Sequence, residues 1–148
     1  MVESKKSLQA TAGSKLESET EIKTALQVAI FGREQSAGTT FYVIRTWLIY
    51  QPGEISGPLQ KRYSQFFELH EALERMGYEN LPQLPRKKFY MSERDTDDRQ
   101  RGLESYLKEL VNRKDTRNSL PVVEFLNLHE VCPEVMYNVP QLLIKREF

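Results

Sequence analysis

The first position that could do chemistry is Arg62, in the run Lys61-Arg62-Tyr63-Ser64, where a predicted strand meets the start of a predicted helix. Backbone N–H groups at a helix N-terminus favour anions, and an adjacent arginine can hold a phosphate through two parallel hydrogen bonds. Tyr63 could offer a flat apolar face to a ring-shaped ligand. The plainer alternative is an ion pair between Arg62 and a helix glutamate such as Glu68.

A second basic group follows two prolines in the segment Leu81-Pro82-Gln83-Leu84-Pro85-Arg86-Lys87-Lys88. Pro82 and Pro85 are three residues apart, which is one turn of polyproline II. Three interpretations are open. The segment could be a rigid solvated linker, a proline-rich ligand for a partner protein through Pro82–Lys87, or a stiff turn that presents Lys87 to an anion.

The third basic position is Arg99, which stands four residues before Leu103 and seven before Tyr106. Helical periodicity therefore places Arg99 on the apolar face of its helix. A charge on that face is costly unless it is paired or opens into a polar pocket, and both arrangements fit. Arg101 points nearly opposite, so we expect it on the surface.

Three large side chains, Phe89, Tyr90 and Met91, come directly after the proline segment. They could dip into a lipid interface as an apolar anchor, or they could belong to the core. The acidic residues that follow would repel an anionic membrane if they faced it; they are Glu93, Asp95, Asp97 and Asp98.

Other chemistry has little support. We find no nucleophile–base pair, no paired catalytic carboxylates and no glycine-rich phosphate loop, so the sequence predicts no enzyme and no cofactor. The only histidines, His70 and His129, are far apart in sequence, and Cys132 is the only cysteine. A zinc site and an internal disulfide are therefore not expected.

The charges balance, because 21 Lys and Arg residues face 21 Asp and Glu residues among 148. A bulk electrostatic nucleic-acid binder would show a strong basic excess, so we expect no nucleic-acid partner and only a local anion site. No apolar run is long enough to cross a membrane. We expect a soluble, cytoplasmic protein.

The pattern along the chain predicts an α+β fold: a three-stranded antiparallel β-meander packed against three to four helices with a polyproline turn. We expect a disordered leader over 1–18, one domain over 19–130 and an extension over 131–148 that packs on the domain or leads to a further one. Alternation and apolar runs predict strands, and i, i+3, i+4 spacing predicts helices. The strands are expected over 22–30, 41–50 and 59–63, with a turn over 32–38, and the helices over about 64–76, 95–112 and 121–128. Ser64 is the expected cap of the first helix, and Gly77 is expected to end it.

Together, these stretches resemble the phox-homology (PX) domain over about residues 19–128. The match comprises KRYSQF entering a helix over 61–66, LPQLPRK over 81–87, and Arg99 four residues before the Leu of the Gly-Leu-x-x-Tyr-Leu stretch that begins at Gly102. The resemblance implies that Arg62 grips a 3-phosphate, with Ser64 adding a hydroxyl contact, and that Tyr63 packs on the inositol ring. It also implies that Lys87 meets the 1-phosphate and Arg99 the 4- and 5-hydroxyls.

The leading hypothesis is thus a lipid-binding module that recognises phosphatidylinositol 3-phosphate and recruits its chain to endosome-like membranes as a peripheral protein. The competing hypothesis is a protein-interaction module with little lipid binding. It would use the Pro82–Lys87 turn or another surface of the same fold.

Overall fold

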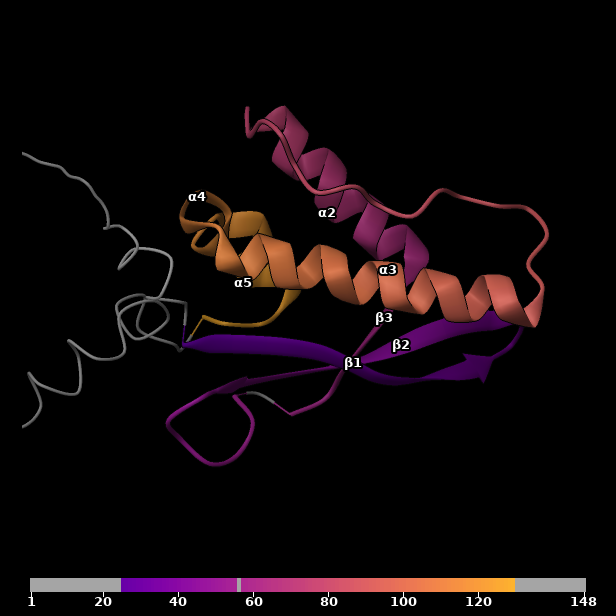
Figure 1. Ribbon diagram of the computed structural model, residues 1–148, viewed down its shortest axis with the longest axis horizontal. Coiled ribbons are helices and arrows are strands. Elements are labelled where there is room, and N and C mark those ends of the chain that lie inside the picture. Colours follow the sequence, from indigo (N-terminus) through magenta and orange to yellow (C-terminus); the bar gives the residue numbers. More distant parts are fainter. Residues whose placement is uncertain (1–24, 56, 130–148) are drawn as a thin grey trace, which may run out of the picture.

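The computed structural model describes residues 25–55 and 57–129, and within them a three-stranded antiparallel sheet is followed by four helices (Figure 1). This arrangement confirms the predicted α+β class. The predicted leader 1–18, the extension 131–148 and Cys132 lie outside the described residues. The elements in chain order are β1 (Leu26–Ser36), β2 (Thr39–Leu48), β3 (Leu59–Arg62), α2 (Tyr63–Arg75), α3 (Glu93–Asn112), α4 (Lys114–Arg117) and α5 (Leu120–Phe125).

The sheet keeps the chain order β1-β2-β3, so each strand pairs with its sequence neighbour. Side chains alternate between the two faces of a strand, and one face of β1 and β2 is buried under the helices. In Figure 1 the helices lie on one side of the sheet, and the loop after β2 lies on the other. The buried strand residues are Leu26, Val28, Ile30, Tyr42, Ile44, Thr46 and Leu48.

The β1–β2 hairpin is longer than the sequence indicates. The predicted turn over 32–38 is wrong, because β1 continues to Ser36 and only Ala37 and Gly38 make the turn, with φ of 50° and 79°. A register shift at Phe31 lets the strand continue past Gly32. The backbone N–H of Ile30 beside this bulge donates to Glu104 of α3 at 3.3 Å, which ties the irregularity to the helix.

Helix α2 begins directly after β3, one residue earlier than predicted. Arg62 is the N-cap residue, and its backbone N–H donates to the side chain of Gln65 at 3.0 Å. Ser64, predicted to cap this helix, therefore lies within its first turn. Gly77 has φ of 93°, a left-handed conformation that glycine adopts without strain, and it follows the helix as expected.

Helix α3 is held at both ends. Ser92 accepts a hydrogen bond from Asp95 N–H while Asp95 accepts one from Ser92 N–H, which is a reciprocal cap, so the helix starts before the predicted Asp95. At the other end, Arg113 donates to the carbonyls of Glu79 and Asn80 at 3.0 and 2.8 Å. The connection from α2 to α3 is thus fixed where it begins.

The core lies between the sheet and helices α2, α3 and α5. Phe66 of α2 makes edge-on contacts with Tyr42 of β2 and Phe125 of α5, with ring centroids 6.2 and 5.0 Å apart. Such contacts stabilise a core beyond the area they bury. None of the helices in the described part of the chain is both long and apolar enough to span a bilayer.

Candidate functional site

All five side chains predicted to contact a headgroup line one hollow at the hairpin end of the sheet. The hollow has a volume of about 330 Å³, and no carboxylate stands among the described residues that line it. Arg62, Tyr63 and Ser64 come from the β3–α2 junction, Lys87 from the proline segment and Arg99 from α3. The remaining lining residues are Gly38, Thr39, Thr40, Tyr42, Met91 and Thr96.

Arg62 is exposed at the first turn of α2. Among the described residues its guanidinium has no hydrogen bond or ion pair, so the alternative pairing with Glu68 is not observed. Arg62 and Ser64 line the hollow at the start of α2, where the first N–H groups of a helix have no partner within the helix. This combination of donors and positive charge can hold a tetrahedral oxyanion.

Arg99 and Tyr63 form a stacked pair in the wall of the hollow. The Arg99 guanidinium lies 4.1 Å from the centre of the Tyr63 ring, and its Nη2 donates to the Arg86 carbonyl at 3.1 Å. Of the two arrangements considered for Arg99, the structure thus favours the pocket over an ion pair. Burial raises the pKa of the Tyr63 hydroxyl, and the Arg99 charge opposes part of this rise. The phenol therefore stays neutral at physiological pH.

The proline segment packs inward instead of standing free. Pro82 is buried, the carbonyl of Pro85 accepts a hydrogen bond from the Tyr63 hydroxyl, and a Cβ on Gly102 would come within 2.7 Å of the Pro85 ring. Gly102 therefore allows α3 to approach the segment closely. This packing covers much of the surface that an external aromatic groove would need, and it leaves Lys87 exposed at the rim of the hollow.

Sequence reasoning missed one wall of the hollow, the tip of the β1–β2 hairpin. Thr39, Thr40 and buried Tyr42 line it directly, and Arg33 fastens the hairpin to α3 through Asp97 at 2.7 Å and Gln100 at 2.8 Å. Burial raises the pKa of Tyr42, and the positive charges of Arg99 and Arg33 oppose that shift. The two threonines after a tight turn were the available signal.

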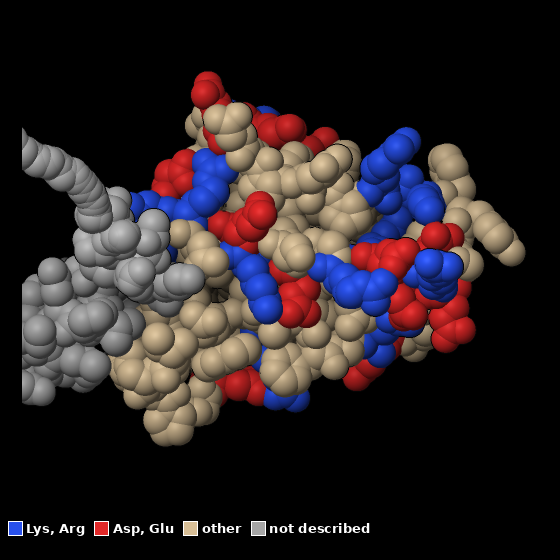
Figure 2. Space-filling view, viewed as in Figure 1, with Lys and Arg blue, Asp and Glu red and all other residues tan. Residues whose placement is uncertain are grey.

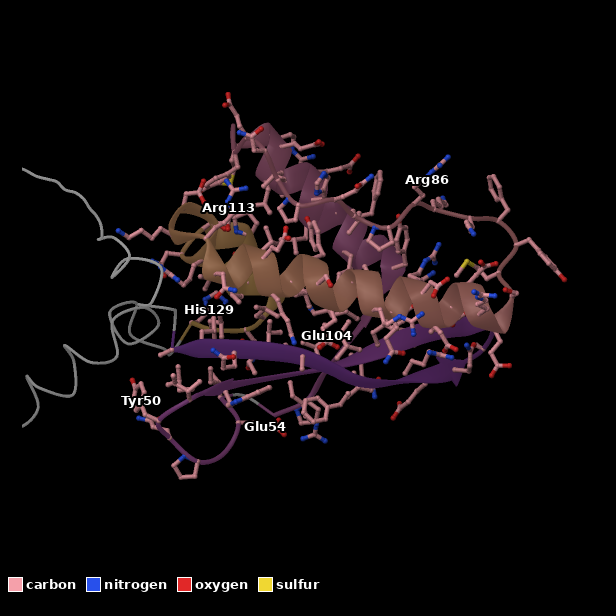
Figure 3. All side chains as sticks on the ribbon, viewed as in Figure 1. Tyr50, Glu54, Arg86, Glu104, Arg113 and His129 are labelled. Carbon is pink, nitrogen blue, oxygen red and sulfur yellow. The ribbon has the colours of Figure 1, made fainter. Side chains whose placement is uncertain are left out.

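The three candidate membrane-inserting residues separate into two groups. Phe89 and Tyr90 are 100% and 87% exposed, whereas Met91 is half-buried and lines the hollow. The exposed pair belongs to the loop that runs from Arg86, labelled in Figure 3, to the start of α3. Figure 2 shows basic side chains gathered at this end of the molecule, with acidic ones beside them.

Three of the four acidic residues near this loop have basic partners. Asp95 pairs with Lys88 at 3.1 Å, Asp97 pairs with Arg33, and Asp98 pairs with exposed Arg101. These pairs reduce the repulsion that free carboxylates would exert on an anionic surface.

The histidines stand apart from the hollow. His70 shares a 2.8 Å hydrogen bond with the Tyr106 hydroxyl in the packed layer between α2 and α3, and His129 is exposed at the opposite end of the molecule from Arg86 (Figure 3). Within the described residues, no group of three or more His, Cys, Asp or Glu side chains is placed to hold a metal ion.

Comparison with known proteins places these features in a family. The PX domain family matches residues 56–129 of the chain. Sorting nexin-16 from Homo sapiens and from Rattus norvegicus is 35% identical to it over 100 residues, which cover 66% of this chain. The chain spans 28% of the length of these relatives.

Solved structures agree with the sequence comparison. A designed CISK PX domain matches with a TM-score of 0.61 and 30% identity, covering 68% of this chain and 97% of its own. The mouse SNX19 PX domain with a bound sulphate ion matches with a TM-score of 0.54 and 27% identity, covering 71% and 98%. The sheet-then-helices fold, the matched residues and these relatives together show that the chain belongs to the PX domain family.

Proposed function

We propose that this chain binds phosphatidylinositol 3-phosphate in the hollow between the hairpin, α2 and α3, and that this binding recruits it to endosomal membranes. PX domains are in general phosphoinositide-binding, membrane-targeting modules and are typically not enzymes. The observation that carries the proposal is the convergence of Arg62, Lys87 and Arg99 on one hollow whose described lining contains no carboxylate. A chain with zero net charge thereby acquires a local anion site.

The arrangement of the cations supports a headgroup with one main phosphate contact. Among the described residues no partner occupies the Arg62 guanidinium, which lies at the start of α2, so Arg62 is the stronger phosphate ligand. The Arg99 guanidinium already stacks on the Tyr63 ring and donates one N–H to the Arg86 carbonyl. Its remaining N–H groups suit hydroxyls better than a second phosphate. The related SNX19 PX domain has a bound sulphate ion, which shares the tetrahedral shape of phosphate.

The loop beside the hollow supports contact with a membrane rather than with a free headgroup. Phe89 and Tyr90 project fully into solvent only two and three residues after Lys87. Apolar and aromatic side chains beside basic ones favour the interface of an anionic bilayer. We therefore propose that Phe89 and Tyr90 insert while Lys87 faces the lipid phosphate. Met91, which lines the hollow, stays on the protein side.

The test is co-sedimentation with vesicles that carry one phosphoinositide at a time, or phosphatidylserine alone, using wild type, Arg62→Ala and Arg75→Ala. Arg75 is an exposed arginine at the far end of the same helix and serves as the matched control. We expect wild type and Arg75→Ala to prefer 3-phosphate vesicles. Removing one partner of a charged pair costs about 2–5 kcal/mol, so Arg62→Ala should abolish measurable binding.

Two results would contradict the proposal. One is undiminished binding by folded Arg62→Ala protein, which would remove the hollow from the mechanism. The other is equal binding of wild type to every anionic vesicle, which would replace a specific headgroup site by general electrostatic attraction. Recruitment in cells is tested separately, by comparing the endosomal fraction of wild type with that of Arg62→Ala.

A further inference from the structure

The outer face of the sheet is more apolar than a face open to water requires. An antiparallel sheet with helices on one side normally alternates apolar residues inward and polar residues outward. Here the side chains that alternate with the buried ones include Val43 and Trp47 of β2 and Ile49 directly after it. Phe31 projects outward at the bulge of β1. Phe31 is 62% exposed and Ile49 is 58% exposed.

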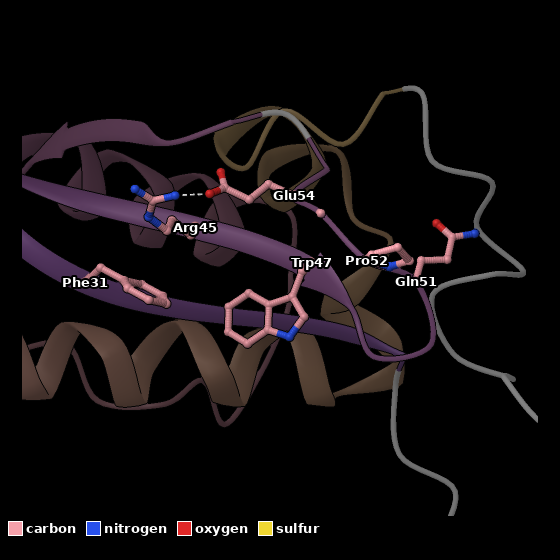
Figure 4. A pocket seen from close by; sticks show the side chains of 7 residues that line it. Phe31, Arg45, Trp47, Gln51, Pro52 and Glu54 are labelled. Carbon is pink, nitrogen blue, oxygen red and sulfur yellow. Dashed lines mark hydrogen bonds and ion pairs between the residues drawn. The ribbon is translucent and has the colours of Figure 1, made fainter.

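The loop after β2 turns part of this face into a groove. Glu54 forms a bridge with Trp47, and the groove, about 820 Å³ in volume, lies between this loop and the strands (Figure 4). The Phe31 and Trp47 rings meet edge-on at 6.1 Å, and Arg45 lies over Phe31 at 5.4 Å. Arg45 also pairs with Glu54, so the two charges in the groove cancel. An apolar segment is the ligand that such a lining would bury favourably.

The chain itself contains one segment with this character. The residues outside the described part are 1–24, 56 and 130–148. The C-terminal stretch is rich in large apolar side chains: Val131, Val135, Met136, Tyr137, Val139, Leu142, Leu143 and Ile144. Those of the N-terminal stretch are fewer and scattered. The C-terminal stretch is therefore the better candidate to cover the groove.

The place where the described chain ends is compatible with such a contact. The last described residue is His129, and in Figure 3 His129, Tyr50 and Glu54 lie toward the same end of the long axis of the molecule. An extended chain advances about 3.3 Å per residue, so the 19 residues that follow His129 can reach up to about 60 Å.

We propose that segment 135–144 folds back in cis onto the groove formed by Phe31, Arg45, Trp47 and the loop 51–54. This contact covers the apolar outer face of the sheet with a third layer. It lies on the face opposite the helices, away from the phosphoinositide hollow, and does not depend on the proposed lipid.

Trp47 provides a direct test because it is the only tryptophan of the chain. The full chain carrying Leu142→Glu with Leu143→Glu is compared with wild type by tryptophan emission and acrylamide quenching. The matched control carries Leu8→Glu with Leu16→Glu, the same change in the N-terminal stretch. We expect the C-terminal variant alone to shift the emission to the red and raise the quenching constant several-fold, while circular dichroism stays unchanged. Identical spectra for all three proteins would overturn the proposal.

A reciprocal test changes the groove and observes the tail. Trypsin can cut after Lys145 and Arg146, and intact mass reports the loss of the last residues. Proteolysis follows the population of the open form, so if the segment is docked about nine-tenths of the time, Phe31→Glu should speed this cut about tenfold. Phe67→Glu, at another exposed phenylalanine on α2, should leave the rate unchanged.

Concentration separates docking within one chain from docking between copies. In cis, Trp47 emission and the cleavage rate stay constant as the protein is diluted, and light scattering gives a monomer mass at each dilution. A red shift on dilution together with a dimer mass at high concentration would show that a second copy covers the groove. That result would overturn the proposal, as would equal cleavage rates for wild type and Phe31→Glu.

Discussion

The hollow lined by Arg62 and the groove lined by Trp47 differ in the chemistry of their linings and in how the chain assembles them. The hollow that we propose as the lipid site brings together residues from the hairpin, the β3–α2 junction, the proline segment and α3, and its charged lining residues are all cations. The groove on the outer face comes from one stretch of β2 and its following loop, together with Phe31, and its two charges neutralise one another.

This difference shows how a chain with no net charge can gather cations in one hollow. Three contacts between residues far apart in the sequence position the walls of the hollow: Arg33 with α3, Arg99 with Tyr63, and Pro85 against Gly102. The groove depends on the β1–β2 hairpin, with Phe31 at its bulge, and on the loop that directly follows β2. Changes in the hollow should therefore alter lipid binding and leave Trp47 emission constant, and changes in the groove should do the reverse.

After Arg62→Ala, which should abolish binding, the largest effect should come from Arg99→Ala. The change removes charged hydrogen bonds to the headgroup and the stacking on Tyr63, and hydrogen bonds to charged groups are worth about 1.5–3 kcal/mol. The affinity for 3-phosphate vesicles should fall by about tenfold to a hundredfold, measured by vesicle titration. Arg101→Ala is the control, because Arg101 is exposed and pairs with Asp98. Equal affinities for the two variants would exclude Arg99 from the headgroup contacts.

A smaller, indirect effect is expected from Gly102→Ala. The new Cβ would meet the Pro85 ring at 2.7 Å, and overpacking of this kind costs about 1–3 kcal/mol. Alanine is more favourable than glycine inside a helix by about 1 kcal/mol, and this gain offsets part of the cost. The net loss in unfolding free energy should therefore be modest. The proline segment should shift with Lys87, and lipid affinity should fall several-fold.

Two measurements check this variant, urea unfolding and vesicle titration. Ser105→Ala is a suitable control, because Ser105 is exposed on the same helix and gains propensity without a clash. A Gly102→Ala protein that is more stable than wild type and binds lipid equally would show that the close approach of α3 to Pro85 has no role in shaping the hollow.

The sequence was sufficient for the features that depend on local periodicity. Alternation in β1, the apolar run of β2 and the apolar stripe of α3 are sufficient to predict the α+β fold, which the structure confirms. The same stripe predicts that Arg99 faces inward, and the structure places it in the wall of the hollow. The roles of Arg62, Tyr63, Ser64, Lys87 and Arg99 as lipid ligands follow from the family resemblance and remain predictions.

Features that depend on distant partners could not be predicted. The stretch from Gly32 to Ser36 lacks apolar alternation, so it was interpreted as a turn, yet pairing with β2 and the Arg33 contacts hold it as strand. That error concealed the threonine wall of the hollow. The α2 cap differs from the prediction for a local reason. The Gln65 side chain accepts from the Arg62 N–H three residues earlier, and sequence alone does not rank Arg62 against Ser64 as the cap.

In the groove, Glu54→Gln should have a small effect on stability and none on lipid binding. The Arg45–Glu54 pair is partly exposed, with side chains 38% and 26% accessible, and pairs of this kind contribute at most about 1 kcal/mol. We expect a slight drop in the urea midpoint and an unchanged affinity for 3-phosphate vesicles. A clear loss of lipid affinity would show that the two regions are coupled through β2, contrary to the comparison drawn above.

The smallest effect is expected from Asp95→Asn in the first turn of α3. The same turn carries Thr96 at the edge of the hollow. The backbone N–H of Ser92, and then the Lys88 ammonium, lower the pKa of the Asp95 carboxyl to about 2. An unfolded Asp titrates near pH 3.9, so the folded state favours the carboxylate, and this contribution is present above about pH 4 and is lost as the pH falls toward 2. Asp95→Asn removes this contribution at neutral pH.

The difference in thermal midpoint between wild type and Asp95→Asn should therefore be largest near neutral pH and should shrink as the pH is lowered from about 4 to about 2. Glu93→Gln removes a carboxylate from the same turn without touching the reciprocal cap, so it should not reproduce this pattern. A constant difference across that range would mean that the Asp95 carboxylate does not stabilise the helix start. Since this turn borders the hollow and not the groove, Trp47 emission should stay the same in both variants throughout the pH range in which they remain folded.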